Sequence, residues 1–383
     1  MEKEQRGNRL IALRHLLGLN QTALSTLTGI SQSHISLMER GERAVTDAAV
    51  ETVAQATKTP TAFFEVPATT PFEEITFRKL ATTSAASRDG AIARFNEVER
   101  LALRLGELVQ FPVPKLPVAE GDISGDDIER LAGETRSALG LEPHDPILNL
   151  TRSMERHGIA VAPITDAEED LLGGHDGASR PTQVPRRPVI AYVAGKTGDR
   201  ERFTKAHELG HLVLHAHRPF VLDKIKEREA HRFAGALLIP AEEMRQSVSE
   251  HLALNGYLVL KAQWGLSIAA LITRAHNLGL ISDSRRKSLM VQVSYKGWRK
   301  VEPVEVAPEA PLLLRQMITK SFGRSPYMKA SHALGVPPQF LRQWAPGARE
   351  EDEPAEQPAN QKTSNVISLF NSAQRNDRNA EGH

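Results

Sequence analysis

The sequence contains no cysteine in its 383 residues. This absence excludes disulfide bonds and thiolate metal sites, and it leaves histidine and the carboxylates as the strong side-chain ligands for a metal ion. No run of 18 or more apolar residues occurs, and the start of the chain, Met1 to Gln5, has no apolar signal core. We therefore expect neither a membrane span nor export, which predicts a cytoplasmic protein.

A large charge of either sign is also missing. The chain has 48 Lys and Arg against 47 Asp and Glu, a formal net charge of +1, so its charge indicates no particular partner. With 40% hydrophobic and 25% charged residues over this length, the composition is that of a globular chain with two or three domains.

Residues 202–215 place two histidines and a carboxylate at H-E-x-x-H spacing inside an apolar-periodic run. On a helix, this spacing sets His207 and His211 one turn apart on one face, so that both imidazoles reach one ion. Catalytic zinc takes such nitrogen ligands at about 2.0–2.1 Å and keeps one position open for water. Glu208 would lie beside that water and accept its proton as a general base. The alternative is a coincidental pair of histidines, which is rare at 14 histidines in the chain.

A third protein ligand for zinc has four candidates downstream: His215, His217, Glu227 and Glu229. His217 follows His207 by ten residues, as in metzincins, but Leu214 stands where that motif requires a turn glycine. On a continuing helix, the His215 side chain is turned about 80° from that of His207 and lies two turns further along the axis. We therefore expect His215 to contact a zinc ligand, not the zinc ion.

A second predicted helix, residues 224–240, puts Glu227 on one face with Ala230, Phe233 and Ala234. An inward carboxylate without a partner is costly, so this position favours Glu227 as a ligand over an acid that only complements the helix dipole. Glu229 falls off this apolar stripe, and we expect it to be solvated.

Residues 6–64 show the helix-turn-helix pattern. The predicted helices cover residues 8–17, 21–28, 32–39, 46–56 and 60–64, with glycine turns between the early ones. Gly29 supplies the tight turn, Ser31 is a predicted N-cap, and Leu24 and Ile35 face inward. The alternative is a small helical protein-interaction domain.

Resemblances to two known families make these predictions more specific. The runs R-F-T-x-A-H-E-L-G-H-L-V-L-H at 202–215 and E-x-E-A-x-R-F-A-x-x-L-L-I-P at 227–240, with the predicted strand 188–193 before them, resemble the ImmA/IrrE metallopeptidases that carry an N-terminal Xre-type domain. This resemblance implies Zn²⁺ bound by His207, His211 and Glu227, with Glu208 as general base. It further implies cleavage of a partner repressor protein, which relieves transcription during stress or mobile-element induction. His231 departs from the family, which more often has Asn or Asp there.

The N-terminal pattern is similar to the Xre and phage-repressor family. The resemblance implies that residues 32–39 enter the major groove of double-stranded DNA, and the implied contacts are base edges for Gln32, Ser33 and His34, with Ser36 nearby, and phosphates for Gln21 and Arg43. Residues 1–66 carry seven Lys or Arg and seven Asp or Glu. Because a neutral module has little phosphate attraction, we expect a homodimer on two half-sites.

The rest of the chain predicts a mainly α fold with a small β-sheet (α+β). Expected helices cover 87–109, 125–139, 146–157, 241–254, 267–278, 312–320, 327–334 and 338–344, and expected strands cover 72–79, 159–163, 188–193 and 289–293. Residues 165–187 form a predicted polar loop. Residues 330–344 have a faint second helix-turn-helix pattern, but we favour the alternative, a helical hairpin that packs on the peptidase domain.

We predict five segments: a five-helix DNA-binding domain (1–66), a linker with a spacer helix (67–120), a zincin-like metallopeptidase domain (121–283), a C-terminal α/β region (284–345) and a disordered tail (346–383). The competing hypothesis is a helix-turn-helix regulator whose peptidase-like domain only senses a metal or ligand.

Overall fold

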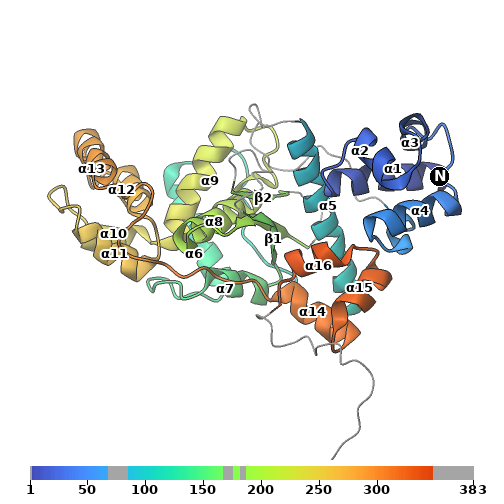
Figure 1. Cartoon of the computed structure of the whole chain (residues 1–383). Helices are drawn as coiled ribbons and strands as arrows, with labels where there is room; N and C mark the ends of the chain where they lie inside the picture. The colour runs from blue at the N-terminus through green and yellow to red at the C-terminus, as the bar shows by residue number, and fades with distance from the viewer. Residues whose placement is uncertain (1, 68–84, 167–175, 182–186, 348–383) are drawn as a thin grey trace, which may run out of the picture. The chain divides into compact units, whose positions relative to one another are not determined.

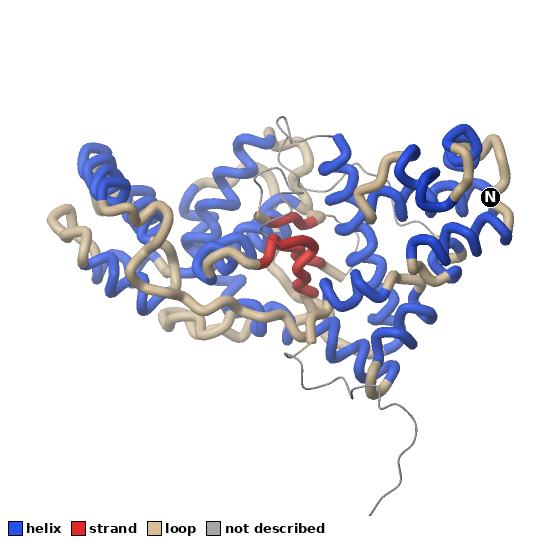
Figure 2. Tube along the Cα trace, viewed as in Figure 1, coloured by secondary structure: helices blue, strands red, loops and turns tan. Residues whose placement is uncertain are grey.

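The computed structural model describes residues 2–67, 85–166, 176–181 and 187–347. Helices make up most of these residues, and one small sheet lies among them (Figure 2). This confirms the predicted fold class, mainly α with a small β-sheet. The expected strand at 72–79 lies outside the described residues, as does nearly all of the expected disordered tail.

The N-terminal domain consists of four α-helices and a 3₁₀ helix, as the sequence predicts (Figure 1). They are α1 (Glu2–Leu16), α2 (Gln21–Thr28), α3 (Gln32–Glu39), α4 (Asp47–Thr57) and η1 (Thr61–Phe64). The turn between α2 and α3 depends on Gly29, whose φ of 73° suits glycine. Side chains cap the helix starts, because Asn20 accepts a hydrogen bond from the Ala23 amide and Ser31 one from the His34 amide.

The sheet has three strands in the order β1-β3-β2. Strand β1 (Ala160–Asp166) is parallel to β3 (Val189–Ala194), and β2 (Gly177–Ser179) is antiparallel to β3 at the other edge. Strand β2 falls inside the region predicted as a polar loop. Its three residues, Gly-Ala-Ser, have no strand-forming composition, so the pairing with β3 decides their conformation.

The sheet separates two hydrophobic cores, because its residues alternate between the two faces. One face, with Ala162 and Ala191, packs in a core with the N-terminal domain, α5 (Ala85–Leu108) and the last three helices of the described chain. The other face, with Val161 and Ile190, packs against the helices of residues 125–295. Strands β1 and β3 therefore contribute side chains to both cores.

Eight helices lie on the second face or extend its core. They are α6 (Gly125–Ala138), α7 (Leu150–Arg156), α8 (Gly198–His215), α9 (Asp223–Leu238), α10 (Ala241–Ser247), α11 (Gly256–Trp264), α12 (Ile268–Asn277) and α13 (Asp283–Tyr295). Helix α7 starts later than predicted, where the Asn149 side chain caps the Arg152 amide. The predicted helix 241–254 stops at Ser247, since Val248 is extended, and α11 occupies residues for which the sequence analysis predicts no helix.

The strand predicted at residues 289–293 is wrong, because these residues belong to α13. Ser282 caps this helix by accepting a hydrogen bond from the Arg285 amide. Leu289 and Val293, both buried, are four residues apart and so lie on one helical face. The cap and the four-residue spacing of the buried side chains therefore favour a helix here.

Three further helices end the described chain: α14 (Leu313–Phe322), α15 (Pro326–Leu334) and α16 (Pro338–Trp344). Helix α16 packs on β1, as expected for one arm of the hairpin at 330–344, whereas α15, the other arm, packs on η1 of the N-terminal domain. Helix α14 also packs on β1. Among the described helices, none is long and apolar enough by itself to cross a membrane, and only the bent pair α11 and α12, at 99°, reaches that length and composition together.

A buried ionic network joins the N-terminal domain to α5 and α15. Glu97 of α5 is 2% exposed and accepts hydrogen bonds from Arg9 of α1 and from Arg100. Arg9 also donates to the Phe63 carbonyl, and Arg100 donates to the carbonyls of Leu334 and Gly335 at 2.8 and 3.0 Å. The Glu97 carboxylate thus holds two guanidinium groups, which also bind the backbone of two other segments, at Phe63 and at 334–335.

We expect Glu97→Gln to lower the free energy of unfolding by about 3–5 kcal/mol, because it leaves two buried guanidinium groups without their counter-charge. Urea unfolding measures this loss. Glu107→Gln is the matched control, since Glu107 lies on the same helix in an exposed pair with Arg104 and should change stability by less than about 0.5 kcal/mol. Equal effects of the two substitutions would contradict the network.

The same network predicts a pH dependence. Burial by itself raises the pKa of Glu97, but Arg100 and Arg9 outweigh it and lower the pKa to about 2. A carboxylate with a depressed pKa contributes stability above its unfolded value of about 4.3, and this contribution is lost as the pH falls toward 2. Wild type should therefore lose more stability than Glu97→Gln between pH 5 and pH 2, measured by urea unfolding.

Candidate metal centre

The crossing of α8 and α9 positions the candidate centre, and a glycine permits their close approach. A Cβ atom on Gly210 would lie 2.9 Å from the Phe233 ring and 3.3 Å from the Cα of Ala230 on α9. Any side chain at this position would push α9 away from α8. Because α9 carries Glu227 one turn before Ala230, the separation of the helices sets the separation of the candidate ligands.

We expect Gly210→Ala to destabilise the protein by about 1–3 kcal/mol through overpacking at this crossing. Gly133→Ala is the matched control, since Gly133 also lies within a helix, α6, but has open space where its Cβ would be. That substitution should stabilise by about 0.5–1 kcal/mol through helix propensity. Thermal unfolding compares the two variants, and a stabilised Gly210→Ala would refute the close contact.

Three side chains from α8 and α9 form a small triangle of donor atoms. The Nε2 atoms of His207 and His211 are 3.1 Å apart, and each lies 3.5 Å from an oxygen of Glu227. Burial opposes ionisation of Glu227, but hydrogen bonds with His207 and His211 prevail and hold its pKa below the ordinary range. The triangle therefore combines two imidazoles with a carboxylate that remains charged.

The triangle fits a tetrahedral metal ion. Zinc bonds of about 2.0–2.1 Å at tetrahedral angles separate neighbouring donor atoms by about 3.3–3.4 Å. The observed separations of 3.1 and 3.5 Å lie on either side of this value. His211 is 2% exposed, and the side chains of His207 and Glu227 are 17% and 22% exposed, so one side of the triangle is open to solvent.

Glu208 lies next to the triangle and is itself a potential donor. Ligand atoms of His207, Glu208 and His211 lie within 4.8 Å of one another. Glu208 differs from Glu227 because its carboxylate already accepts a hydrogen bond of 2.7 Å from Ser179 of β2. Glu227, in contrast, faces both imidazoles. On this geometry we assign Glu227 to the donor triangle and Glu208 to its side.

Ser179 escaped the sequence analysis because it lies in β2, within the region predicted as a loop. Its hydroxyl contacts both the carboxylate and the backbone carbonyl of Glu208, at 2.7 and 3.2 Å. Gly177 of the same strand permits this approach, since a Cβ there would lie 2.9 Å from the Glu208 side chain. The edge strand therefore fixes the orientation of Glu208.

A second row of side chains supports His211 from behind. The Nδ1 atoms of His211 and His215 are 2.9 Å apart, and His215 Nε2 lies 3.2 Å from Glu229. Burial, and then the charges of His211 and Arg218, lower the pKa of His215 to about 2, so its ring is neutral. The neutral His215 ring donates its Nε2 proton to Glu229, so its Nδ1 atom accepts a hydrogen bond from Nδ1 of His211. The proton of His211 is then on Nδ1, and its Nε2 atom can bind a metal.

The expectation that Glu229 is solvated is wrong. Glu229 is 8% exposed, and Arg218 donates to it at 2.7 Å. A signal was present in the sequence, because Glu229 precedes the buried residues Phe233 and Leu237 by four and eight positions, which places all three along one side of α9. Arg218, its partner, comes from the connection between the two helices and could not be identified by periodicity.

The other two histidines near the centre lie outside the triangle. His217 comes after the end of α8, and its Nδ1 atom lies 3.8 Å from the Glu120 carboxylate. The ring of His231 lies tilted against that of Phe203, with ring centroids 4.7 Å apart, and its centroid is 6.4 Å from that of His207. His231 therefore borders the first metal-facing histidine.

In the N-terminal domain, hydrogen bonds tie the start of α3 to α2. Gln32 donates to the Gln21 side chain at 2.7 Å, and Gln21 donates to Glu39 at 2.7 Å. Arg14 of α1 completes this set by donating to Glu39. Two of the proposed DNA contacts, Gln21 and Gln32, are thus brought together and held in one orientation.

The remaining proposed contacts lie along α3 and after it. Ser33 and Arg43 are exposed, and His34 is half-buried. Ser36 accepts a hydrogen bond of 2.5 Å from Arg40, so that its hydroxyl is already engaged. At the start of α3, Gln32 and Ser33 are exposed but also engaged, with Gln21 and Ser31, and His34 is half-buried.

Two family models match the chain. Residues 154–276 match the IrrE N-terminal-like domain of peptidase family M78, a segment that contains β1 to α12 and all three residues of the triangle. Residues 10–64 match the helix-turn-helix model, which includes α2 and α3. No curated protein matches the chain. The chain therefore combines an Xre-type helix-turn-helix domain with an IrrE N-terminal-like, metallopeptidase-like domain, the architecture of a DNA-binding regulator.

Proposed function

We propose that the protein is a DNA-binding zinc endopeptidase that cleaves a partner repressor protein and so relieves transcription under stress or during mobile-element induction. The donor triangle of His207, His211 and Glu227, with Glu208 at its side, is the observation that carries this proposal. Operator DNA and repressor proteins meet in the cytoplasm, so we place both activities there.

In this proposal His207, His211 and Glu227 hold zinc, which supplies a Lewis acid for the scissile carbonyl. Glu208 accepts a proton from the attacking water and delivers it to the leaving amine. Ser179 keeps the Glu208 carboxylate oriented. The hydrogen bonds that link His211 to His215, Glu229 and Arg218 fix the orientation of His211.

DNA recognition in this proposal belongs to α3. Gln32, Ser33 and His34 would contact base edges, with Ser36 nearby, and Gln21 and Arg43 would contact phosphates. Because the N-terminal 66 residues have equal numbers of acidic and basic residues, binding as a homodimer to two half-sites of a double-stranded operator would compensate for weak attraction per copy.

The second candidate is a regulator whose metallopeptidase-like domain only senses a metal or ligand. The Arg9, Glu97 and Arg100 network favours it, since this network mechanically links the DNA-binding helices to the rest of the molecule. Such a link would transmit a change in the second half to α3 without any cleavage.

One experiment separates the two candidates. Cells that express wild type or Glu208→Gln are compared by proteomics of new protein N-termini under inducing stress. The endopeptidase predicts a cleaved repressor with wild type only, together with loss of the transcriptional response in Glu208→Gln. If Glu208→Gln retains the full response and a double Gln32→Ala/His34→Ala variant abolishes it, the sensor hypothesis is favoured and the peptidase proposal fails.

We expect Gln32→Ala to weaken binding to the specific operator by about 1–3 kcal/mol, because a base-edge contact carries sequence discrimination. Binding to random duplex at the same salt should change little. Fluorescence anisotropy measures both affinities, with the promoter of the protein's own gene as the first DNA. Gln292→Ala on α13 serves as the control and should bind like wild type, whereas equal weakening on both DNAs would contradict the placement of α3.

A further inference from the structure

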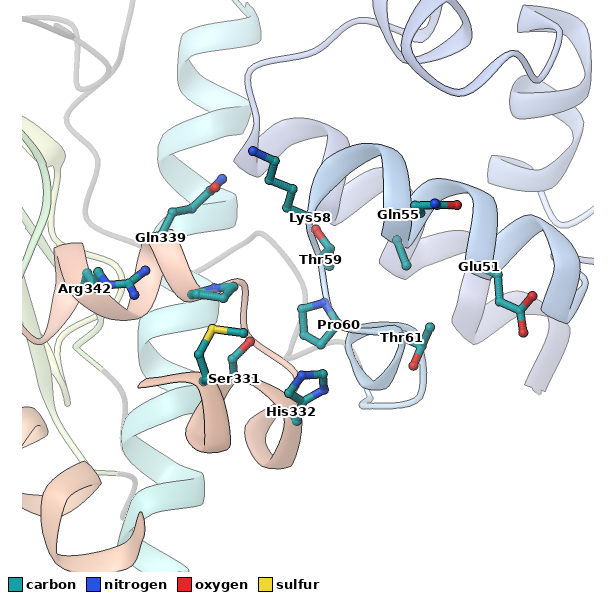
Figure 3. A pocket seen from close by; sticks show the side chains of 13 residues that line it. Glu51, Gln55, Lys58, Thr59, Pro60, Thr61, Ser331, His332, Gln339 and Arg342 are labelled. Atoms are coloured by element: carbon teal, nitrogen blue, oxygen red, sulfur yellow. The ribbon is translucent and has the colours of Figure 1, made fainter. Parts of the chain in front are cut away.

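A cavity that is largely open to solvent lies between the N-terminal domain and the C-terminal helices (Figure 3). Its volume is about 690 Å³, within the range of about 300–1,000 Å³ that small-molecule sites occupy. The end of α4 and the start of η1 line one side, and α15 and α16 line the other. The DNA-binding domain therefore contributes directly to a ligand-sized space.

The lining combines positive charge with apolar surface. Lys58, Arg342 and His332 are the basic residues of the lining, whereas Glu51 is the one carboxylate among the described residues that line it. Apolar surface comes from Pro60, Met328 and Pro338, and Met328 is 53% exposed. This chemistry suits an organic anion that has one charged group and a short apolar body.

The backbone at Lys58 supports a functional role for this residue. Lys58 ends α4 with φ of 53°, in the left-handed region where a side chain costs roughly 1–2 kcal/mol and glycine or asparagine is usual. Figure 3 shows its side chain extending over the cavity toward Gln339 of α16. Strain of this kind is retained mainly where the side chain has a task.

The two walls of the cavity touch at a fixed point beside it. A Cβ on Gly335 would lie 2.8 Å from the Ala62 carbonyl, and Arg100 donates to the Gly335 carbonyl. The same contact brings η1 against the turn between α15 and α16. A ligand that contacts both walls must stabilise this docked arrangement, because it binds that arrangement better than a separated one.

We propose that this cavity binds a small organic anion, whose carboxylate or phosphate lies on the side of the lining that carries Lys58 and Arg342 and whose apolar body lies against Pro60, Met328 and Pro338. Binding clamps the DNA-binding domain onto the C-terminal helices. The site is separate from the metal centre, and its existence does not depend on peptidase activity or on zinc.

Calorimetric titration of the full-length protein with hexanoate and with hexyl phosphate tests the proposal and ranks the two anionic groups. We expect saturable binding to one site. Lys58→Asn removes the charge but tolerates the left-handed backbone, and it should weaken binding about tenfold or more, the size of a lost charged hydrogen bond. Lys296→Asn, which removes an exposed lysine of the segment after α13, should bind like wild type.

Acetate and hexanol each supply one half of the ligand, and both should bind at least about tenfold more weakly than hexanoate. Hydrogen exchange should slow in 54–64 and 328–342 when hexanoate binds to wild type. The proposal is overturned if neither anion binds at millimolar concentration, if Lys58→Asn binds like wild type, or if Lys296→Asn loses as much affinity. Unchanged exchange in both walls would overturn the clamp.

Discussion

The Glu208→Gln variant is expected to retain its metal and to lose cleavage by about 10²–10⁴-fold, the contribution of a general base. The amide oxygen can still accept the hydrogen bond from Ser179, so the side chain should keep its position. It cannot accept a proton. Elemental analysis gives the metal content, and single-turnover cleavage of the repressor found by proteomics gives the rate.

Two further variants define what this result means. Ser179→Ala should retain metal and lose about tenfold in rate, since it removes the hydrogen bond that orients Glu208 but not the carboxylate. Glu120→Gln, a change of an exposed carboxylate near His217, should affect neither quantity. Loss of metal from Glu208→Gln would instead make Glu208 a ligand, as its position within 4.8 Å of the histidine nitrogens permits.

The elements that carry the candidate site could be predicted from the sequence because their signals are local. The apolar periodicity around His207 and His211 gave a helix, and the predicted Ser31 cap placed the start of α3. Glu227 could be placed on the inner face of α9 from its spacing to Ala230 and Phe233 alone. In each case residues within two helical turns determine the conformation.

The features that escaped prediction depend on contacts between distant residues. Strand β2 exists because β3 pairs with it, and Ser179 reaches Glu208 only through that pairing. Arg9 and Glu97 are 88 positions apart, and Arg100 contacts a carbonyl 235 positions away. No periodicity or spacing rule connects such residues, because folding alone brings them together.

The identity of the third ligand gives the second large expected effect. Glu227→Ala should weaken zinc binding by more than about 100-fold, because it removes one of the three donor groups, and cleavage should be lost with the metal. His207→Ala and His211→Ala should lose zinc as well. Competition with a graded series of chelators measures the affinity of each variant.

Glu229→Ala and His217→Ala complete this series, and the structure separates them. Glu229 accepts hydrogen bonds from His215 and Arg218, so its loss should weaken zinc binding by about 10–100-fold, an effect that a solvated Glu229 would not have. His217 lies outside the donor triangle, and His217→Ala should bind zinc like wild type. Full affinity in Glu227→Ala together with loss in His217→Ala would reverse the assignment and make the centre metzincin-like.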